Sequence, residues 1–215
     1  MNTPRPLPVY ALTGTIGSGK STVANILEDS GSILLDADVL AREVVLPDSE
    51  GLRALRNQFG QSIILPDGTL DRKKLGSLVF SDPKARESLE SILHPLIRQL
   101  YLSKLSKLQS EAQNGLHPQA LSIVYVVPLL FESKNTYPEI DKTIVVAAPR
   151  ELCIKRIMAR DHCSSELAEQ KLDSQLPIEE KIKRADYVVN NTGTTEELES
   201  EVHHLIRSLQ SKGAS

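Results

Sequence analysis

The residues from Gly14 to Ser21 have the types and the spacing needed to hold a chain of phosphates. They match the phosphate-loop pattern Gly-x-x-x-x-Gly-Lys-Ser/Thr at every fixed position. In such a loop successive backbone N–H groups turn toward one centre, and the N-terminus of the next helix adds its positive dipole end. Lys20 can then reach the β- and γ-phosphates, and the Ser21 hydroxyl can ligate Mg²⁺. The alternative is a glycine-rich turn that binds nothing.

Two acidic residues follow the next apolar run. Asp36 and Asp38 come directly after Ile33–Leu35, and two acids two positions apart at the end of a strand point similarly, near the phosphate loop. A kinase of small hydroxyl substrates needs a carboxylate there to accept the proton of the attacking hydroxyl or to hold Mg²⁺ through water. The alternative is structural: Asp38 would cap a helix over Val39–Val45. The two roles do not exclude each other.

Arg156 and Arg160 stand four residues apart in a segment with a helical pattern, so they share one face of that helix. Two guanidinium groups over a phosphoryl group in transfer would neutralise the charge that spreads over its oxygens. The alternative is a solvated basic face on which Glu151 or Asp161 pairs with the arginines.

Two further positions allow two interpretations each. His94 could reach a substrate phosphate, although a single histidine is more often a packed or surface residue. Asn190-Asn191, after the last apolar run, could contact adenine or form a turn.

No acid ends the apolar run Leu121–Val127, and no Asn-Lys-x-Asp segment is present to read guanine. These absences disfavour a motor, a transporter ATPase and a signalling GTPase.

Five short apolar, β-branched runs must position these residues. They are Val9–Thr13, Ile33–Leu35, Leu121–Val127, Thr143–Ala147 and Tyr187–Val189. Continuous apolar runs are typical of strands buried on both faces of a parallel sheet, and the helical patterns between most of them imply βαβ crossovers. We therefore predict an α/β fold, a three-layer α/β/α P-loop NTPase with a five-stranded parallel sheet. Its core comprises residues 8–39, 119–149 and 186–212.

Two helical insertions are expected beside this core. Residues 40–118 contain several helical segments and no convincing strand, and Pro95 should kink or restart the helix in which it falls. Residues 150–185 are helical and rich in charge, and they join strand ends where ligands bind in such sheets, so we expect them to form a lid. Thr194 and Glu197 form a capping box at the start of the last helix.

Composition places the 215 residues among globular proteins. The net charge is −3, and the basic residues are dispersed, which predicts no nucleic-acid partner. No window approaches the about 20 apolar residues of a membrane span, and the N-terminus lacks a secretory signal, so we expect no membrane partner and a cytoplasmic protein. Cys153 and Cys163 are predicted to be free thiols, since neither they nor the histidines have metal-ligand spacing.

Taken together, these blocks resemble the dephospho-CoA kinase family. They occur in the family's order and are Thr13–Thr22, Asp36–Asp38 with Ala41-Arg42, His94–Ile97, Val127–Glu132, Arg156 with Arg160-Asp161, and Ala185-Asp186 with Asn191 and Gly193. The phosphate loop alone is shared by many enzymes, but the combination is far more specific. The resemblance implies that ATP phosphorylates the ribose 3′-hydroxyl of dephospho-CoA, the last step of coenzyme A synthesis.

The resemblance also implies roles for individual residues. The ATP-binding residues would be Gly17, Ser18, Gly19, Lys20, Ser21, Thr22, Arg160 and Asn191. The catalytic residues would be Asp38 as the base, Lys20 and Arg156, and the substrate-binding residues would be Asp38, Arg42 and His94. Ser21 and Asp36 would serve Mg²⁺, residues 40–118 would form the CoA side, and Gln175 and Lys181 fall where the lid ends. The partners are then ATP and dephospho-CoA, for a monomer or weak homo-oligomer.

The chain departs from the family pattern at two positions. Thr15 replaces a glycine that is usual in the loop, which should be tolerated if its backbone needs no positive φ, and Cys153 stands where a glutamine is common. Two other functions stay open. One is another small-molecule or nucleoside monophosphate kinase of the same architecture, and the other is a nucleotide-binding regulator without catalysis.

Overall fold

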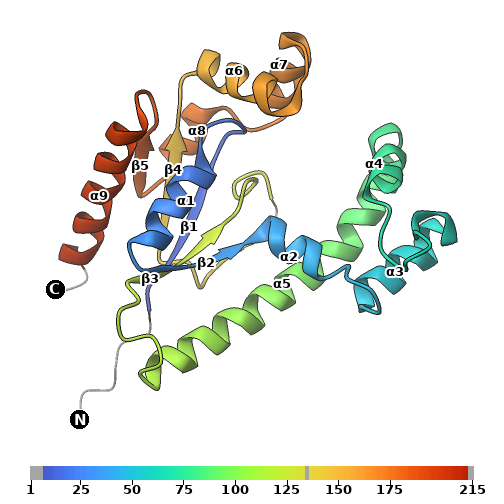
Figure 1. The fold of residues 1–215 in the computed structure, drawn as a ribbon, viewed down its shortest axis with the longest axis horizontal. Coiled ribbons are helices and arrows are strands. Elements are labelled where there is room, and N and C mark those ends of the chain that lie inside the picture. Colours follow the sequence, from blue (N-terminus) through green and yellow to red (C-terminus); the bar gives the residue numbers. More distant parts are fainter. Residues whose placement is uncertain (1–6, 134–135, 213–215) are drawn as a thin grey trace. The chain divides into compact units, whose positions relative to one another are not determined.

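A computed structural model describes residues 7–133 and 136–212 of the chain. The chain folds into two compact units (Figure 1). The first unit comprises the described residues up to Leu35 together with those from Glu111 onward, and the second comprises Asp36–Ser110. Each unit is described by itself.

The first unit is built on a five-stranded sheet with the order β2-β3-β1-β4-β5. Its strands are β1 (Val9–Gly14), β2 (Ser32–Asp36), β3 (Ser122–Val126), β4 (Lys142–Ala147) and β5 (Tyr187–Asn190). The central strand β1 pairs in parallel with both β3 and β4, so that Leu12 lies opposite Val126 on one side and Ile144 on the other. The predicted runs differ from these strands by one residue at most ends, and the expectation of an α/β fold with a five-stranded parallel sheet is confirmed.

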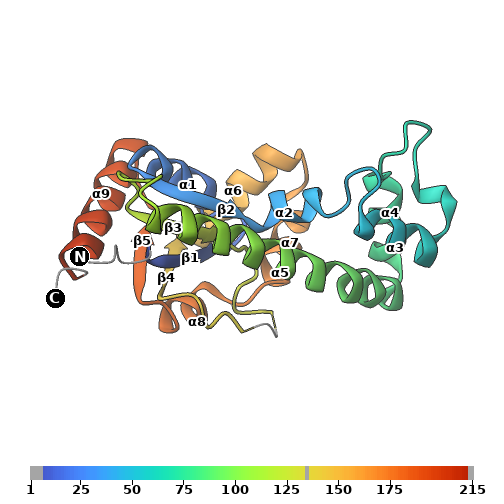
Figure 2. The same ribbon diagram turned by 90° about the horizontal axis from the view of Figure 1, so that it is seen from below.

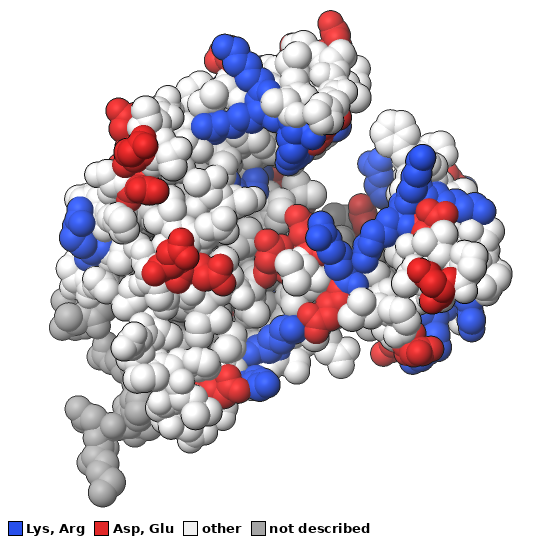
Figure 3. Space-filling model, in the orientation of Figure 1, with Lys and Arg blue, Asp and Glu red and all other residues white. Residues whose placement is uncertain are grey.

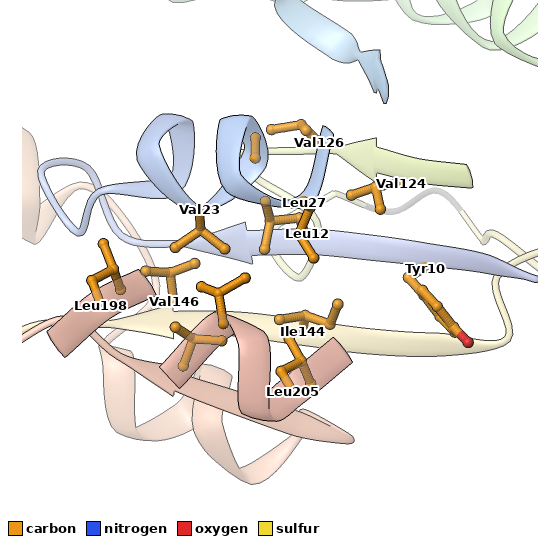
Figure 4. Close-up of a cluster of buried hydrophobic side chains, with 13 residues drawn as sticks. Tyr10, Leu12, Val23, Leu27, Val124, Val126, Ile144, Val146, Leu198 and Leu205 are labelled. Carbon is orange, nitrogen blue, oxygen red and sulfur yellow. The ribbon is translucent and has the colours of Figure 1, made fainter. Parts of the chain in front are cut away.

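Two helices cover one face of the sheet because their apolar stripes match it. In α1 (Lys20–Asp29), Val23 and Leu27 pack against the strands, and α9 (Thr195–Lys212) adds Leu198, Val202 and Leu205 to the same cluster (Figure 4). Continuous β-branched strands need such cover on their faces, since they carry no polar side to present to water.

Local signals set the ends of these two helices. Gly31 has φ +100° and its N–H bonds back to the Glu28 carbonyl, which is the expected stop after α1. At α9 the predicted capping box is confirmed, because the Thr194 N–H donates to Glu197 Oε2 at 2.9 Å and the Glu197 N–H donates to Thr194 Oγ1 at 3.3 Å.

The charged segment after β4 folds into three helices, α6 (Arg150–Asp161), α7 (Ser165–Asp173) and α8 (Ile178–Lys183). Buried Cys153 and Ile157 of α6 pack with Ala168 and Leu172 of α7, so these two helices share a small core of their own. Seen from below, α8 lies on the other side of the strands from α1 (Figure 2). Among the described helices, none is long and apolar enough to cross a membrane.

The second unit is helical. It consists of α2 (Ala37–Glu43), α3 (Glu50–Phe59), the 3₁₀ turn η1 (Gln61–Ile63), α4 (Arg72–Ser81) and most of α5 (Pro83–Gln113). Val45, Leu55, Ile63 and Leu75 form its buried cluster. Ser49 caps α3 and Asp71 caps α4 through their side-chain oxygens, as residues of these types commonly do.

Two expectations for this unit need correction. Pro95 does not restart the helix, because α5 runs unbroken through it. A proline inside a helix costs about 3 kcal/mol, but Leu89, Ile92 and Leu93 in the preceding turns pack against the buried cluster and hold the helix in place. The helix predicted over Val39–Val45 instead begins at Ala37, so its cap is not Asp38.

Candidate active site

The phosphate loop joins the end of β1 to the start of α1, and its glycines are required for two reasons. Gly17 and Gly19 have φ angles of +78° and +94°, which residues with a side chain rarely adopt. A Cβ at Gly17 would also lie 2.7 Å from the Cys153 carbonyl oxygen, and one at Gly19 would collide with the Asn191 amide. The loop therefore packs tightly against α6 and the end of β5.

Thr15 fits this loop without strain. It is not among the residues with positive φ, so the condition for tolerating a side chain here is met. Its hydroxyl lies 3.9 Å from the sulfur of Cys153, which is buried. Burial raises the pKa of the Cys153 thiol, so the group stays protonated at neutral pH. Cys153 and Cys163 are both free, as predicted.

Lys20 is held by the loop that precedes it. Its ammonium donates to the carbonyl oxygens of Gly14 at 2.9 Å and of Thr15 at 2.8 Å. Ser21 and Thr22 follow in the first turn of α1 and are exposed. Ser18 is fully buried, and no hydrogen-bond partner is found for its hydroxyl within the described chain. The loop thus brings together an ammonium, a helix N-terminus and the exposed hydroxyl groups of Ser21 and Thr22.

Arg156 reaches the loop from α6. Its guanidinium donates to the carbonyl oxygens of Gly17 at 3.3 Å and Ser18 at 3.4 Å, and also to Asn191 Oδ1 at 3.2 Å. Asn191 is buried and donates its amide to the Ser18 carbonyl at 2.8 Å. Two predicted site residues from distant parts of the chain therefore converge on the loop. Gly19, Thr22, Arg156, Asn191, Gly193 and Thr194 are among the residues that line a hollow of about 160 Å³ beside it.

Arg160 behaves differently from Arg156. Its guanidinium donates to both carboxylate oxygens of Asp161, at 2.7 and 3.2 Å, and its side chain is 62% exposed. Lys171 of α7 pairs with the same carboxylate. Arg160 first, and then Lys171, hold the pKa of Asp161 well below its usual range. Lys and Arg side chains gather over α6 and α7 (Figure 3). Among them, Arg160 pairs with Asp161, as the interpretation of a solvated basic face expected.

Gln175 contacts the phosphate loop, and Lys181 pairs with Glu132 outside it, in ways that the sequence pattern did not specify. Gln175 Oε1 accepts the backbone N–H of Ile16 at 2.8 Å. Lys181 is fully buried, and its ammonium lies 2.6 Å from Glu132 Oε1. No local signal pointed to this burial, because α8 is a short, mostly charged helix. A buried lysine needs an anionic partner, and the fold supplies Glu132 from a distant part of the chain.

The remaining predicted site residues belong to the second unit. Asp36 ends β2 and caps α2, because its Oδ1 accepts the N–H groups of Asp38 at 2.7 Å and Val39 at 3.2 Å. Asp38 is exposed, as are Arg42 in the last turn of α2 and His94 in α5. The capping role offered as the alternative for Asp38 belongs to Asp36, two residues earlier, since the N–H groups at the start of α2 bond to Asp36.

Ser21 has the chemistry to hold a magnesium ion together with the phosphates of a nucleotide. Within residues 7–133 and 136–212, no group of three His, Cys, Asp or Glu side chains could hold a metal ion. Mg²⁺ commonly keeps several waters and binds through one or two side chains plus substrate phosphates. The exposed Ser21 hydroxyl at the start of α1 fits such a coordination.

Comparison with known proteins gives the same assignment over most of the chain. The family model described as dephospho-CoA kinase matches residues 9–197. A protein named dephospho-CoA kinase from Geobacter sulfurreducens is 45% identical over 197 residues, which cover 92% of this chain and 96% of that protein. A similarly named protein from Listeria monocytogenes is 39% identical and covers 91% of this chain and 94% of its own length.

Solved structures agree with the sequence comparisons. The structure of dephospho-CoA kinase from Campylobacter jejuni is 34% identical, with a TM-score of 0.71 and coverage of 96% of this chain and 98% of that one. The structure of TT1252 from Thermus thermophilus is also 34% identical, with a TM-score of 0.72 and coverage of 97% and 98%. The expected family is confirmed, and the chain belongs to the dephospho-CoA kinase family.

Proposed function

We propose that this dephospho-CoA kinase transfers the γ-phosphoryl group of ATP to the 3′-hydroxyl of the ribose in dephospho-CoA. Membership of the family makes the chain an ATP-dependent kinase of CoA biosynthesis. The observation that supports the residue-level proposal best is the convergence of Lys20, Arg156 and Asn191 on one phosphate loop. Cationic and N–H donors around a small loop suit a polyphosphate and little else.

The loop residues would bind ATP through its phosphates. The backbone N–H groups from Gly17 to Thr22 and the N-terminus of α1 would hold the phosphate oxygens, with Ser18 contributing through the backbone. Lys20 would turn from the carbonyls of Gly14 and Thr15 to the β- and γ-phosphates. An ammonium that exchanges two carbonyl partners for phosphate oxygens gains charge-assisted hydrogen bonds.

The hollow beside the loop would receive the nucleoside. Its lining joins Gly19 and Thr22 to Asn191, Gly193 and Thr194 after β5. Because Asn191 already bonds Ser18 and Arg156, we propose that it shapes this hollow and contacts adenine only with its remaining surface. Arg160 would contribute to ATP binding by exchanging Asp161 for phosphate, which makes its contribution smaller than that of Arg156.

Ser21 would hold Mg²⁺ together with phosphate oxygens, and Asp36 would act through water with the carboxylate oxygen that does not cap α2. The bound ion would neutralise charge on the β- and γ-phosphates. Asp38 would accept the proton of the attacking hydroxyl, a role that its exposure permits. Arg156 would stabilise the charge that develops on the equatorial oxygens.

The acceptor side would use Asp38, Arg42 and His94. Arg42 and His94 are exposed, and each can pair with a phosphate of dephospho-CoA. Closure of α6, α7 and α8 over ATP would exclude water, which would otherwise hydrolyse it. We further propose that the enzyme works in the cytoplasm as a monomer or weak homo-oligomer.

An acceptor panel tests this proposal. The purified protein is given ATP and Mg²⁺ with dephospho-CoA, AMP, CMP or shikimate, and ADP release is followed by a coupled assay. We expect turnover with dephospho-CoA and less than about 1% of that rate with the other acceptors, because the exposed cations would select a phosphopantetheine-bearing nucleotide. Comparable rates with AMP or CMP would favour the nucleoside monophosphate kinase alternative, and ATP binding without turnover would favour the regulator.

A further inference from the structure

The short connection between α7 and α8 touches two functional regions through neighbouring residues. Gln175 Oε1 accepts the N–H of Ile16 in the phosphate loop at 2.8 Å. The next residue, Leu176, donates its N–H to Glu132 Oε1 at 3.0 Å. Two successive residues are therefore tied to two different segments at the carboxyl ends of the strands, which restricts how this connection can move.

A buried ion pair holds the same connection from behind. Lys181 in α8 is fully buried, and its ammonium lies 2.6 Å from the Glu132 oxygen that also accepts from Leu176. The ammonium also donates to the Pro128 carbonyl at 3.4 Å, and Thr13 Oγ1 donates to that same carbonyl at 3.3 Å. The network thus extends from α8 to the last residues of β1, directly before the loop.

This arrangement is not the one that stability alone would favour. Burying two charges costs free energy, and apolar residues of similar volume often serve as well or better. Within the described chain, the second oxygen of Glu132 is buried and has no hydrogen-bond partner, so the cost is incompletely offset. What the pair offers over apolar packing is direction, since its hydrogen bonds fix where Leu176, and with it Gln175, must lie.

The loop peptide that Gln175 contacts is the one that holds Lys20. The peptide unit between Thr15 and Ile16 offers its N–H to Gln175. Its carbonyl oxygen accepts from the Lys20 ammonium at 2.8 Å and from the Ser18 N–H at 3.2 Å. Because N–H and C=O of one peptide are coplanar and opposed, fixing one orients the other. Loss of the Gln175 acceptor would let this peptide rotate.

We propose that Gln175 is a positioning residue for the phosphate loop, and that the buried Lys181–Glu132 pair fixes the connection that carries it. Gln175 orients the Thr15–Ile16 peptide, and that peptide in turn closes the turn to Ser18 and holds Lys20 beside the loop until ATP binds. This inference rests on the proposed function, because the shape of the loop matters to activity only if the loop binds ATP. It adds a role for three residues outside the loop.

The decisive variant is Gln175→Met, which keeps the length of the side chain and removes the acceptor. We expect KM for ATP to rise about tenfold, the order of one lost hydrogen bond, while kcat and KM for dephospho-CoA stay within about twofold. Gln175→Glu keeps an acceptor oxygen and should raise KM for ATP less than Gln175→Met does. Thermal unfolding of each variant is recorded, and Tm should stay within about 2 °C, as for a half-exposed residue.

The pair is tested by the double variant Glu132→Gln/Lys181→Met, which removes both charges but keeps an oxygen for the Leu176 N–H. It should raise KM for ATP, and adding Gln175→Met should raise it by less than the product of the separate effects. Lys183→Gln is the matched control, since Lys183 pairs with Glu180 on the exposed side of the same helix and should leave KM unchanged. If the double variant fails to fold, Gln175→Met decides alone.

The inference is overturned if Gln175→Met leaves KM for ATP within about twofold of the wild-type value. It is also overturned if the pair variant lowers Tm without changing KM, because that would be a purely structural role. Calorimetric Kd values for ATP are measured in parallel without an acceptor. A wild-type protein that binds ATP but makes no CoA would count against the proposed function, while the Kd comparison would still decide this inference.

Discussion

The ATP-side and acceptor-side residues are held in contrasting ways. The phosphate loop is bonded by Arg156, Gln175 and Asn191, which lie between 138 and 173 residues away along the chain from the loop residues they contact. Asp38 and Arg42, proposed for the acceptor, are exposed, and the neighbouring Asp36 bonds only to residues two and three positions ahead. The residues proposed to bind ATP are therefore held by long-range contacts, whereas those proposed for the acceptor are held by local structure.

The largest effect is expected at the acid pair, Asp36 and Asp38. Asp38→Asn should lower kcat about 10³-fold, because it removes the base while ATP binding stays intact. Asp36→Asn keeps the helix cap, since asparagine caps as well as aspartate, and should lower kcat less. The two kcat values and calorimetric ATP affinities are measured side by side. Turnover of Asp38→Asn within about threefold of wild type would rule out the base role.

On the ATP side, Lys20→Met should lower kcat about 10²-fold, since one preorganised cation at the transferring phosphoryl group is lost. The loop should keep its shape, because Arg156, Asn191 and Gln175 still bond it, and Tm should fall by no more than about 3 °C. Rates are measured at saturating ATP. A near-normal rate would remove the loop from the mechanism, and a large drop in Tm would show that Lys20 mainly stabilises the fold.

The two arginines of α6 have different partners, Arg156 in the phosphate loop and Arg160 in Asp161. Arg156→Met should lower kcat/KM for ATP about 30-fold, the order of charged hydrogen bonds lost at a site. Arg160→Met should lower it at most about threefold, because Arg160 already has Asp161 as its partner. Steady-state kinetics with varied ATP provide the measurement. Equal losses in both variants would show that Arg160 leaves Asp161 and contributes fully to ATP binding.

The smallest effect concerns Asp161, which pairs with Arg160 in α6 and with Lys171 in α7. Since Arg160 and Lys171 hold the pKa of Asp161 below its usual range, the unfolded chain binds this proton more readily than the folded one. The stabilisation is therefore complete above about pH 4 and is lost as pH falls further. Asp161→Asn should lower the free energy of unfolding by about 1 kcal/mol at pH 6 and by less at pH 3. Urea unfolding at both pH values measures this, and an equal loss at both would contradict it.

Prediction from sequence succeeded where the signals are local. The loop pattern lies within the single segment Gly14–Ser21, which includes Lys20. The strands are recognisable in the sequence as short apolar runs. The capping box of Thr194 and Glu197 follows the same kind of local rule. Asp36 shows the limit of such rules, because two acids two positions apart both satisfy a capping pattern and only the helix start decides between them.

Prediction missed what depends on long-range packing. The contact of Gln175 with Ile16 joins residues 159 positions apart, and no hydrophobic pattern in the sequence could predict it. Lys181 belongs to a short polar helix, so its sequence predicts a solvent-exposed side chain. The fold instead buries it against Glu132. Pro95 shows the converse, because a strong local rule was overridden by apolar packing around α5.

The most direct test follows phosphorus itself. Equimolar ATP and dephospho-CoA are incubated with the protein and Mg²⁺, and ³¹P NMR is recorded over time. The proposed phosphoryl transfer requires loss of the γ-phosphate signal and an equal gain of one phosphomonoester, assigned to the ribose 3′-oxygen of coenzyme A. Release of inorganic phosphate with unchanged dephospho-CoA, or a phosphate on any other oxygen, would contradict it.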